Sequence, residues 1–124
     1  MTALAPGVSL RPARPGDVDT VAALKERVLR GDLEPLVGWD PARSRARVVE
    51  HFSPAHTWMI LVDGETAGTI TLRPDRDALW LEMFYLDERH QGRGIGSSLL
   101  RAVLKDAPVD RKSTRLNSSH GYIS

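Results

Sequence analysis

One stretch, residues 80–105, constrains the fold more than any other part of the chain. It begins with an apolar, aromatic-rich run, Trp80 to Leu86, that has the length and composition of a β-strand. A polar loop with three glycines in five residues follows, and apolar residues then recur at helical spacing. The first amides of a helix have no intrahelical acceptor, and the helix dipole favours negative charge there. A glycine-rich junction of this kind therefore predicts an anion site.

Two common phosphate-binding patterns are absent from this loop. The dinucleotide fingerprint G-x-G-x-x-G would need a glycine at Ser97 or at Leu99. The P-loop pattern G-x-x-x-x-G-K-[ST] would need a lysine directly after a glycine, and none stands there. The loop instead reads Q-x-x-G-x-G, preceded by LEMFYL and followed by SSLL.

With its strand and its helix, this loop closely resembles the acetyl-coenzyme-A signature of the GNAT N-acetyltransferase superfamily. In that family the loop holds the pyrophosphate of the coenzyme, so the resemblance implies acetyl-CoA as the cofactor. Arg89 and Arg93 add positive charge beside it. The other interpretation is a glycine-rich turn that only packs tightly between strand and helix. The loop residues expected to bind the cofactor are Gln91, Gly92, Arg93, Gly94, Ile95, Gly96 and Ser97.

Composition indicates one globular domain. A length of 124 residues suits a single core, and 41% hydrophobic with 27% charged residues is typical of globular proteins. The sequence has no apolar run of membrane-span length, no signal-peptide core and no cysteine, which favours a cytoplasmic protein without a thiol nucleophile. A net charge of +1 indicates no nucleic-acid-binding surface, and no metal ion is expected.

The last fifteen residues, 110–124, depart from the rest of the chain. Their sequence, DRKSTRLNSSHGYIS, loses the Ala/Leu/Val patterning, and its first eleven residues resemble the translation of a sequencing-library adapter. We therefore expect residues 1–109 to form the domain and residues 110–124 to be a non-native or disordered tail, which we leave out of the fold prediction. The alternative is an ordinary polar tail.

The apolar patterns predict a mixed α/β (α+β) fold. Asp17 is the expected N-cap of the first helix, and Gly31 is its expected stop. Asp40 and Pro41 open a second helix in the N-cap and first-turn positions that these residues favour. The predicted elements are, in order, a strand at 8–11, helices at 18–29 and 40–52, strands at 58–62, 66–72 and 78–86, and a helix from 95 onward.

The order β-α-α-β-β-β-α is that of a GNAT-like mixed sheet flanked by helices. The segment RPARPGDVDTVAAL resembles the opening strand and helix of many GNAT proteins. The strand at 58–62 is apolar on both faces, so the sheet should be covered on both sides, and Asp63-Gly64 predicts a hairpin turn after it. A complete family domain continues with a further strand, a helix and a hairpin, so this domain is expected to be truncated after the motif helix.

Acetyl transfer to an amine needs a held thioester, a deprotonated nucleophile and a stabilised oxyanion. The resemblance implies that the pantetheine arm of the coenzyme lies along the central strand, which opens at a bulge, and contacts the backbone of Phe84, Tyr85 and Leu86. Because a free alkyl amine has a pKa of about 10.4, a nearby base is useful. Glu82 is the only acid within this strand and is the candidate catalytic base or acceptor ligand. The alternative is an outward, solvated carboxylate.

Two further points concern where the acceptor amine would bind: the strand face on which Glu82 lies, and the residues that could form a wall of the acceptor cleft. Without a bulge, Glu82 shares side-chain parity with Phe84 and Leu86. In the family, the region that comprises the loop at 31–39 and the second helix forms one wall of the acceptor cleft. The candidates for that wall are Glu34, Trp39, Arg47 and His51, for which packing or solvated surface is the more common role.

Family members commonly carry a tyrosine, in an N-x-x-A-x-x-x-Y-like segment, that protonates the departing thiolate. Asn117 and Tyr122 lie five residues apart within residues 110–124, so neither is assigned that role.

The sequence thus predicts an N-acetyltransferase that transfers an acetyl group from acetyl-CoA to a primary amine of a small molecule or peptide, by direct attack. Two alternatives remain. One is a non-catalytic module that binds acyl-CoA or another nucleotide with the same loop. The other is a fragment that is inactive or does not fold alone. Neither the acceptor nor the oligomeric state follows from the sequence.

Overall fold

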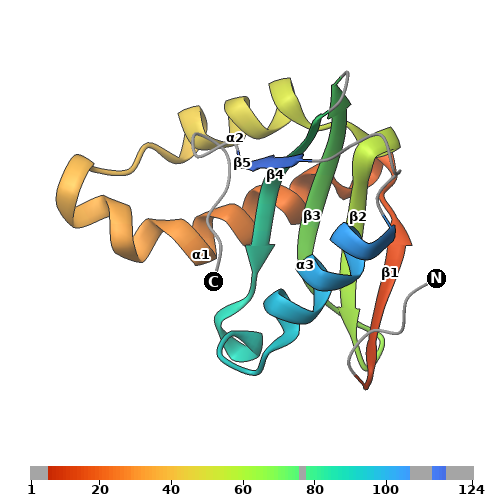
Figure 1. Cartoon of the computed structure of the whole chain (residues 1–124). Helices are drawn as coiled ribbons and strands as arrows, with labels where there is room; N and C mark the ends of the chain where they lie inside the picture. Colours follow the sequence, from red (N-terminus) through yellow and green to blue (C-terminus); the bar gives the residue numbers. More distant parts are fainter. Residues whose placement is uncertain (1–5, 76–77, 107–112, 117–124) are drawn as a thin grey trace.

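A five-stranded sheet separates two helical layers (Figure 1). The computed structural model describes residues 6–75, 78–106 and 113–116. β1 to β4 pair antiparallel in sequence order, and β5 pairs parallel with residues 78–81 of β4. The strands are β1 (Val8–Pro12), β2 (Thr57–Val62), β3 (Glu65–Asp75), β4 (Ala78–Leu86) and β5 (Ser113–Leu116).

Helices cover both faces of the sheet. α1 and α2 lie on one face, and α3 lies on the other (Figure 1). Leu24, Met59 and Tyr85 belong to the core beneath α1 and α2, whereas Phe84 and Leu99 belong to the core beneath α3. The helices are α1 (Val18–Val37), α2 (Pro41–His51) and α3 (Ile95–Asp106), with short 3-10 turns η1 (Pro15–Asp17), η2 (Pro54–His56) and η3 (Glu88–His90).

This arrangement confirms the predicted α/β class, the mixed sheet and the order β-α-α-β-β-β-α. It also confirms that β2 is buried from both sides and that Asp63 and Gly64, at φ 51° and 84°, make the predicted tight turn. β5 was not predicted, because it follows α3 within residues 110–124, which the fold prediction did not include. Asn117 and Tyr122 lie outside the described residues.

The predicted end of the first helix is wrong. α1 runs through Gly31 and Pro35 to Val37, and Gly38 ends it at φ 78° with its N–H bonded to the carbonyl of Glu34. Arg30 forms ion pairs with Glu26 (2.6 Å) and Glu34 (2.9 Å), and the second spans Gly31. These i, i+4 pairs favour continuation of the helix past a glycine that does not adopt a positive φ. No helix among residues 6–75 and 78–106 has both the length and the apolar character needed to cross a bilayer.

The two predicted N-caps behave differently. The Asp40 carboxylate accepts a hydrogen bond from the Arg43 N–H (3.1 Å) and caps α2 as predicted. Asp17 precedes α1, but its carboxylate binds the Arg11 guanidinium (3.0 Å) and the Arg14 N–H (2.8 Å) instead of the amides of α1. It therefore ties β1 to the turn before the helix.

Gly68 permits a close approach between β3 and β4. A Cβ atom at this position would lie 2.3 Å from the Tyr85 carbonyl oxygen and 3.2 Å from the Leu86 Cα atom. Both are backbone atoms in the buried centre of the sheet, so they cannot move aside as a flexible side chain would. The position of this part of β4 therefore depends on a glycine at residue 68.

We predict that Gly68→Ala lowers the free energy of unfolding by about 1–3 kcal/mol, because the added methyl group overpacks the β3–β4 contact. Gly31→Ala is the matched control, since a Cβ atom there meets nothing within 4 Å and the position is helical. This control should raise the free energy of unfolding by about 0.5–1 kcal/mol. Chemical denaturation of both variants measures the difference, and a neutral Gly68→Ala would contradict the close approach.

Candidate active site

A β-bulge interrupts β4 at Met83. Thr71 pairs with Glu82 and Thr69 pairs with Tyr85, so two residues of β4 oppose one residue of β3. Met83 adopts φ 47°, which is uncommon for a residue other than glycine. The bulge that the family resemblance implied is therefore present, in the strand that the resemblance indicated.

The bulge determines which face Glu82 occupies. Met83 and Tyr85 lie in the core beneath α1 and α2, while Phe84 lies in the core beneath α3. Glu82 binds the side chain of Arg73, which also reaches α2, so Glu82 is on the α1/α2 face. The parity with Phe84 that a regular strand would give is therefore lost, because the extra residue in β4 reverses the alternation.

Glu82 is buried and ion-paired. The residue is 8% exposed, and its Oε2 atom lies 3.1 Å from Nε of Arg73. Arg73 also donates a hydrogen bond to the His51 carbonyl oxygen at the end of α2 (3.0 Å). The alternative of an outward, solvated carboxylate is therefore wrong.

The glycine-rich loop is fixed to the end of β4 by a side chain. Gln91 donates a hydrogen bond from Nε2 to the Leu86 carbonyl oxygen (2.7 Å). Gly92 and Gly94 then adopt φ 74° and 77°, and a Cβ atom on either would meet nothing within 4 Å. The loop therefore turns through two left-handed positions with its backbone open on the outer side.

The loop ends at the start of α3, as the sequence predicted. The first hydrogen bond of the helix runs from the Ser98 N–H to the Gly94 carbonyl oxygen (3.0 Å). The amides of Ile95, Gly96 and Ser97 consequently have no intrahelical acceptor, which is the arrangement that attracts anions at helix N-termini.

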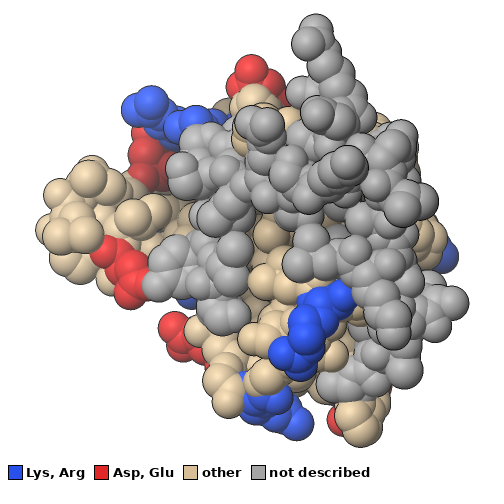
Figure 2. All heavy atoms as spheres, in the orientation of Figure 1, with Lys and Arg blue, Asp and Glu red and all other residues tan. Residues whose placement is uncertain are grey.

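Basic side chains accompany this loop. Arg89 and Arg93 are exposed within it. Figure 2 shows basic side chains on the lower part of the visible face, where Figure 1 places α3 and the loop before it. Their charge adds to that of the helix N-terminus.

Asp87 connects the loop to α1. It is 6% exposed, and its carboxylate lies 3.1 Å from Nη1 of Arg27 and accepts a hydrogen bond from the Arg89 N–H (3.3 Å). Its own N–H donates to the Ala67 carbonyl oxygen (2.8 Å). Asp87 thus joins α1 and the first turn of the loop through its carboxylate, and β3 through its backbone N–H. Asp87 was not among the site residues predicted from the sequence, although an aspartate directly after a strand is a common turn former.

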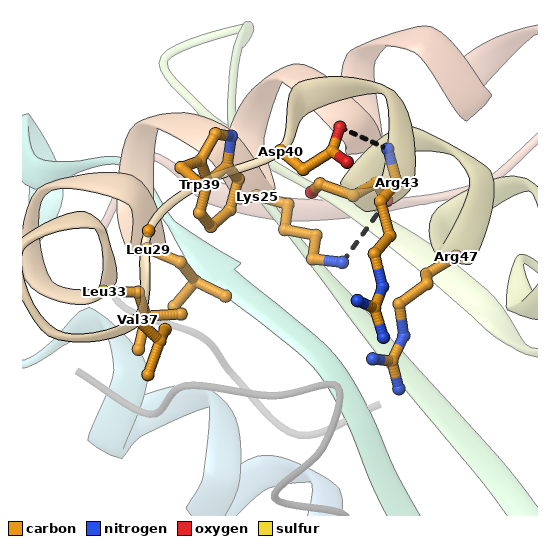
Figure 3. Close-up of a pocket in the computed structure, with 10 residues that line it drawn as sticks. Lys25, Leu29, Leu33, Val37, Trp39, Asp40, Arg43 and Arg47 are labelled. Atoms are coloured by element: carbon orange, nitrogen blue, oxygen red, sulfur yellow. Dashed lines mark hydrogen bonds between the residues drawn. The ribbon is translucent and has the colours of Figure 1, made fainter.

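A cavity of about 500 Å³ lies between α1 and α2 on the opposite face from α3 (Figure 3). Trp39 and Arg47, two of the four candidates for the acceptor wall, line it. Glu34 and His51 do not line it. Glu34 pairs with Arg30 instead, and the His51 carbonyl oxygen accepts a hydrogen bond from Arg73.

The pKa values of two ionisable groups on this side of the sheet are shifted from their ordinary values. Burial lowers the pKa of Lys25, and the nearby positive charge of Arg47 lowers it further. Burial raises the pKa of the Tyr85 phenol above its usual range, an effect that Arg47 partly offsets. Lys25 was not among the site residues predicted from the sequence. Its position four residues after Val21 and four before Leu29 places it on the apolar stripe of α1, which was an available signal.

Comparison with known sequences identifies the family. The sequence model described as "Acetyltransferase (GNAT) family" matches residues 26–119, which is most of the chain. The chain therefore belongs to the GNAT acetyltransferase family. No curated protein matched it.

Solved structures share the fold. A possible acetyltransferase from Clostridium difficile 630 has a TM-score of 0.65 and 21% identity over 89% of this chain and 78% of its own. A putative acetyltransferase from Pyrococcus horikoshii has a TM-score of 0.64 and 15% identity, over 91% and 38%. N-acetylglutamate synthase from Neisseria gonorrhoeae, solved with coenzyme A and L-arginine, has a TM-score of 0.54 and 25% identity, over 79% and 21%. The chain thus spans less than half of the length of the Pyrococcus horikoshii and Neisseria gonorrhoeae proteins.

We predict that Asp87→Ala lowers the free energy of unfolding by about 1–3 kcal/mol, because it removes hydrogen bonds to a charged, buried group. Hydrogen exchange at residues 88–91 should also accelerate. Glu88→Ala is the control, since this neighbouring carboxylate is exposed. Equal exchange rates in the two variants would show that Asp87 does not hold the loop.

Proposed function

We propose that this chain binds acetyl-CoA and transfers its acetyl group to a primary amine of a small molecule or peptide. The observation that carries the proposal is the start of α3, where three successive amides without intrahelical acceptors follow two open glycines. Membership of the GNAT family supports it, and the N-acetylglutamate synthase that shares the fold was solved with coenzyme A.

The loop residues fit the pyrophosphate of a coenzyme. Gly92 and Gly94 leave room for phosphate oxygens against the backbone, because a Cβ atom there would have no neighbour within 4 Å. The amides of Ile95, Gly96 and Ser97 supply hydrogen-bond donors. Arg93 adds a positive charge, and Gln91 acts by holding the loop to β4.

The pantetheine arm is proposed to lie along β4 after the bulge. β5 pairs with residues 78–81, which precede the bulge, and the bulge changes the direction of the backbone beyond them. Extended ligands with amide groups commonly add to a sheet as a further strand. Phe84, Tyr85 and Leu86 are the residues whose backbone would bind the arm.

The proposed reaction needs one proton acceptor on the α1/α2 face. Acetyl-CoA supplies the activated thioester carbonyl. The amine nitrogen forms a C–N bond with that carbonyl carbon, the C–S bond breaks, and the amine proton leaves. Glu82 is proposed to accept this proton through water, because it is the buried carboxylate beside the bulge. The coenzyme thiolate takes up a proton as it departs.

A second candidate function is a non-catalytic acyl-CoA-binding module. The Arg73–Glu82 ion pair favours this second function, because the pairing of Glu82 with a guanidinium is also explained if Glu82 only stabilises the fold. Both candidates require coenzyme binding, and only the first requires turnover.

We predict that Ser97→Glu weakens coenzyme A binding by about tenfold or more, because the new carboxylate repels the phosphates in the first turn of α3. The same change suits a helix N-terminus, so the fold should be retained. Ser97→Ala keeps the backbone amide and should bind nearly as well as the parent chain. Calorimetric titration with acetyl-CoA, coenzyme A and ATP measures the effect. Equal binding of ATP would indicate a generic phosphate site.

We also predict that Glu82→Gln lowers kcat by about 100-fold while coenzyme affinity stays unchanged, as expected for loss of a general base. Glu50→Gln, on the exposed side of α2, is the matched control. Thiol release with a panel of amines measures turnover. An unchanged kcat in Glu82→Gln would assign Glu82 a structural role.

A further inference from the structure

The cavity between α1 and α2 has two chemically different sides. Lys25, Arg43 and Arg47 bring three cationic side chains to one side, and Leu29 and Leu33 lie on the other (Figure 3). Trp39 and Val37 complete the apolar part. Such a combination of an apolar wall with a few convergent polar groups is typical of small-molecule sites.

The cationic side lacks a balancing carboxylate among the described residues. Asp40 is the one acid that lines the cavity, and its carboxylate caps α2 by accepting from the Arg43 N–H. Neither Arg43 nor Arg47 has an ion pair within the described part of the chain. Lys25 donates to a neutral acceptor, the Ser44 carbonyl oxygen, at 3.3 Å.

The charge of Lys25 is disfavoured by its surroundings within the protein. Lys25 is 8% exposed, and both its burial and the charge of Arg47 disfavour its ammonium form. A bound anion would offset both effects, since it restores favourable partners to the buried charge. A second cation would instead be repelled by all three side chains.

The apolar side connects the cavity to β4. Leu29 belongs to the same buried cluster as Met83 and Tyr85, and Trp39 packs against that cluster. Arg47 interacts electrostatically with Tyr85. The walls of the cavity therefore share a core with the bulged part of β4, on the face that also carries Glu82.

We propose that the acceptor is a small amine that also carries a carboxylate and an apolar side chain, which is the chemistry of an apolar amino acid. Lys25, Arg43 and Arg47 bind the carboxylate, and Leu29, Leu33 and Trp39 contact the side chain. Arginine suits this role because its planar guanidinium matches a carboxylate in a bidentate geometry. This inference rests on the proposed function, because it assigns the cavity to the acceptor of that reaction.

The test compares three ligands with one apolar skeleton: L-leucine, L-leucinamide and 3-methylbutylamine. Calorimetry on the full chain, with and without coenzyme A, should give leucine an affinity about tenfold or more above the other two, because only leucine has a carboxylate. Mass spectrometry with acetyl-CoA should detect N-acetylleucine. A phosphonate analogue of leucine that binds tenfold better would overturn the carboxylate assignment.

Arg47→Gln and Arg43→Gln should each remove most of the preference for leucine over leucinamide. Arg45→Gln is the matched control, because Arg45 lies on the same helix, pairs with Asp19 and does not line this cavity. Absent coenzyme A binding would count against the proposed function. With coenzyme A bound, equal affinity for leucine and leucinamide, or leucine binding without acetylation, would overturn the present inference.

Discussion

The bulge at Met83 is the constraint on which the site depends. It places an extra residue in β4, and the strand then resumes with its faces exchanged. Gly68 makes this geometry possible, because any side chain there would collide with the backbone of Tyr85 and Leu86. Asp87 and Gln91 then fix the loop that leads from the bulged strand to α3. Strand, loop and helix start are therefore positioned as one unit.

Much of the fold could be predicted because its signals are local. Alternation and apolar runs indicated the strands, and Asp40-Pro41 indicated the start of α2. The end of α1 could not be read from Gly31, because the Arg30–Glu34 pair favours continuation and it is Gly38, not Gly31, that adopts a positive φ. β5 was not predicted because residues 110–124, which lack the apolar pattern of the rest of the chain, were left out, and because its pairing with β4 is nonlocal.

The candidate site, too, could be predicted from the sequence only in part. The glycine loop was visible in the sequence, since its chemistry lies in the backbone and in the spacing of Gly92, Gly94 and Gly96. The face occupied by Glu82 was not, because one extra residue in a strand reverses side-chain direction without leaving a sequence pattern. The grouping of Lys25 with Arg43 also required the packing of α1 against α2.

The proposed function requires one ligand to span the start of α3 and the bulged half of β4. The most direct measurement is an amide NMR titration of the chain with coenzyme A. We expect the largest shifts to occur together at residues 94–97 and at residues 84–86, with one common dissociation constant. Two results would contradict the proposed ligand position: no change in the amide shifts of either segment, or changes confined to the loop at every ligand concentration.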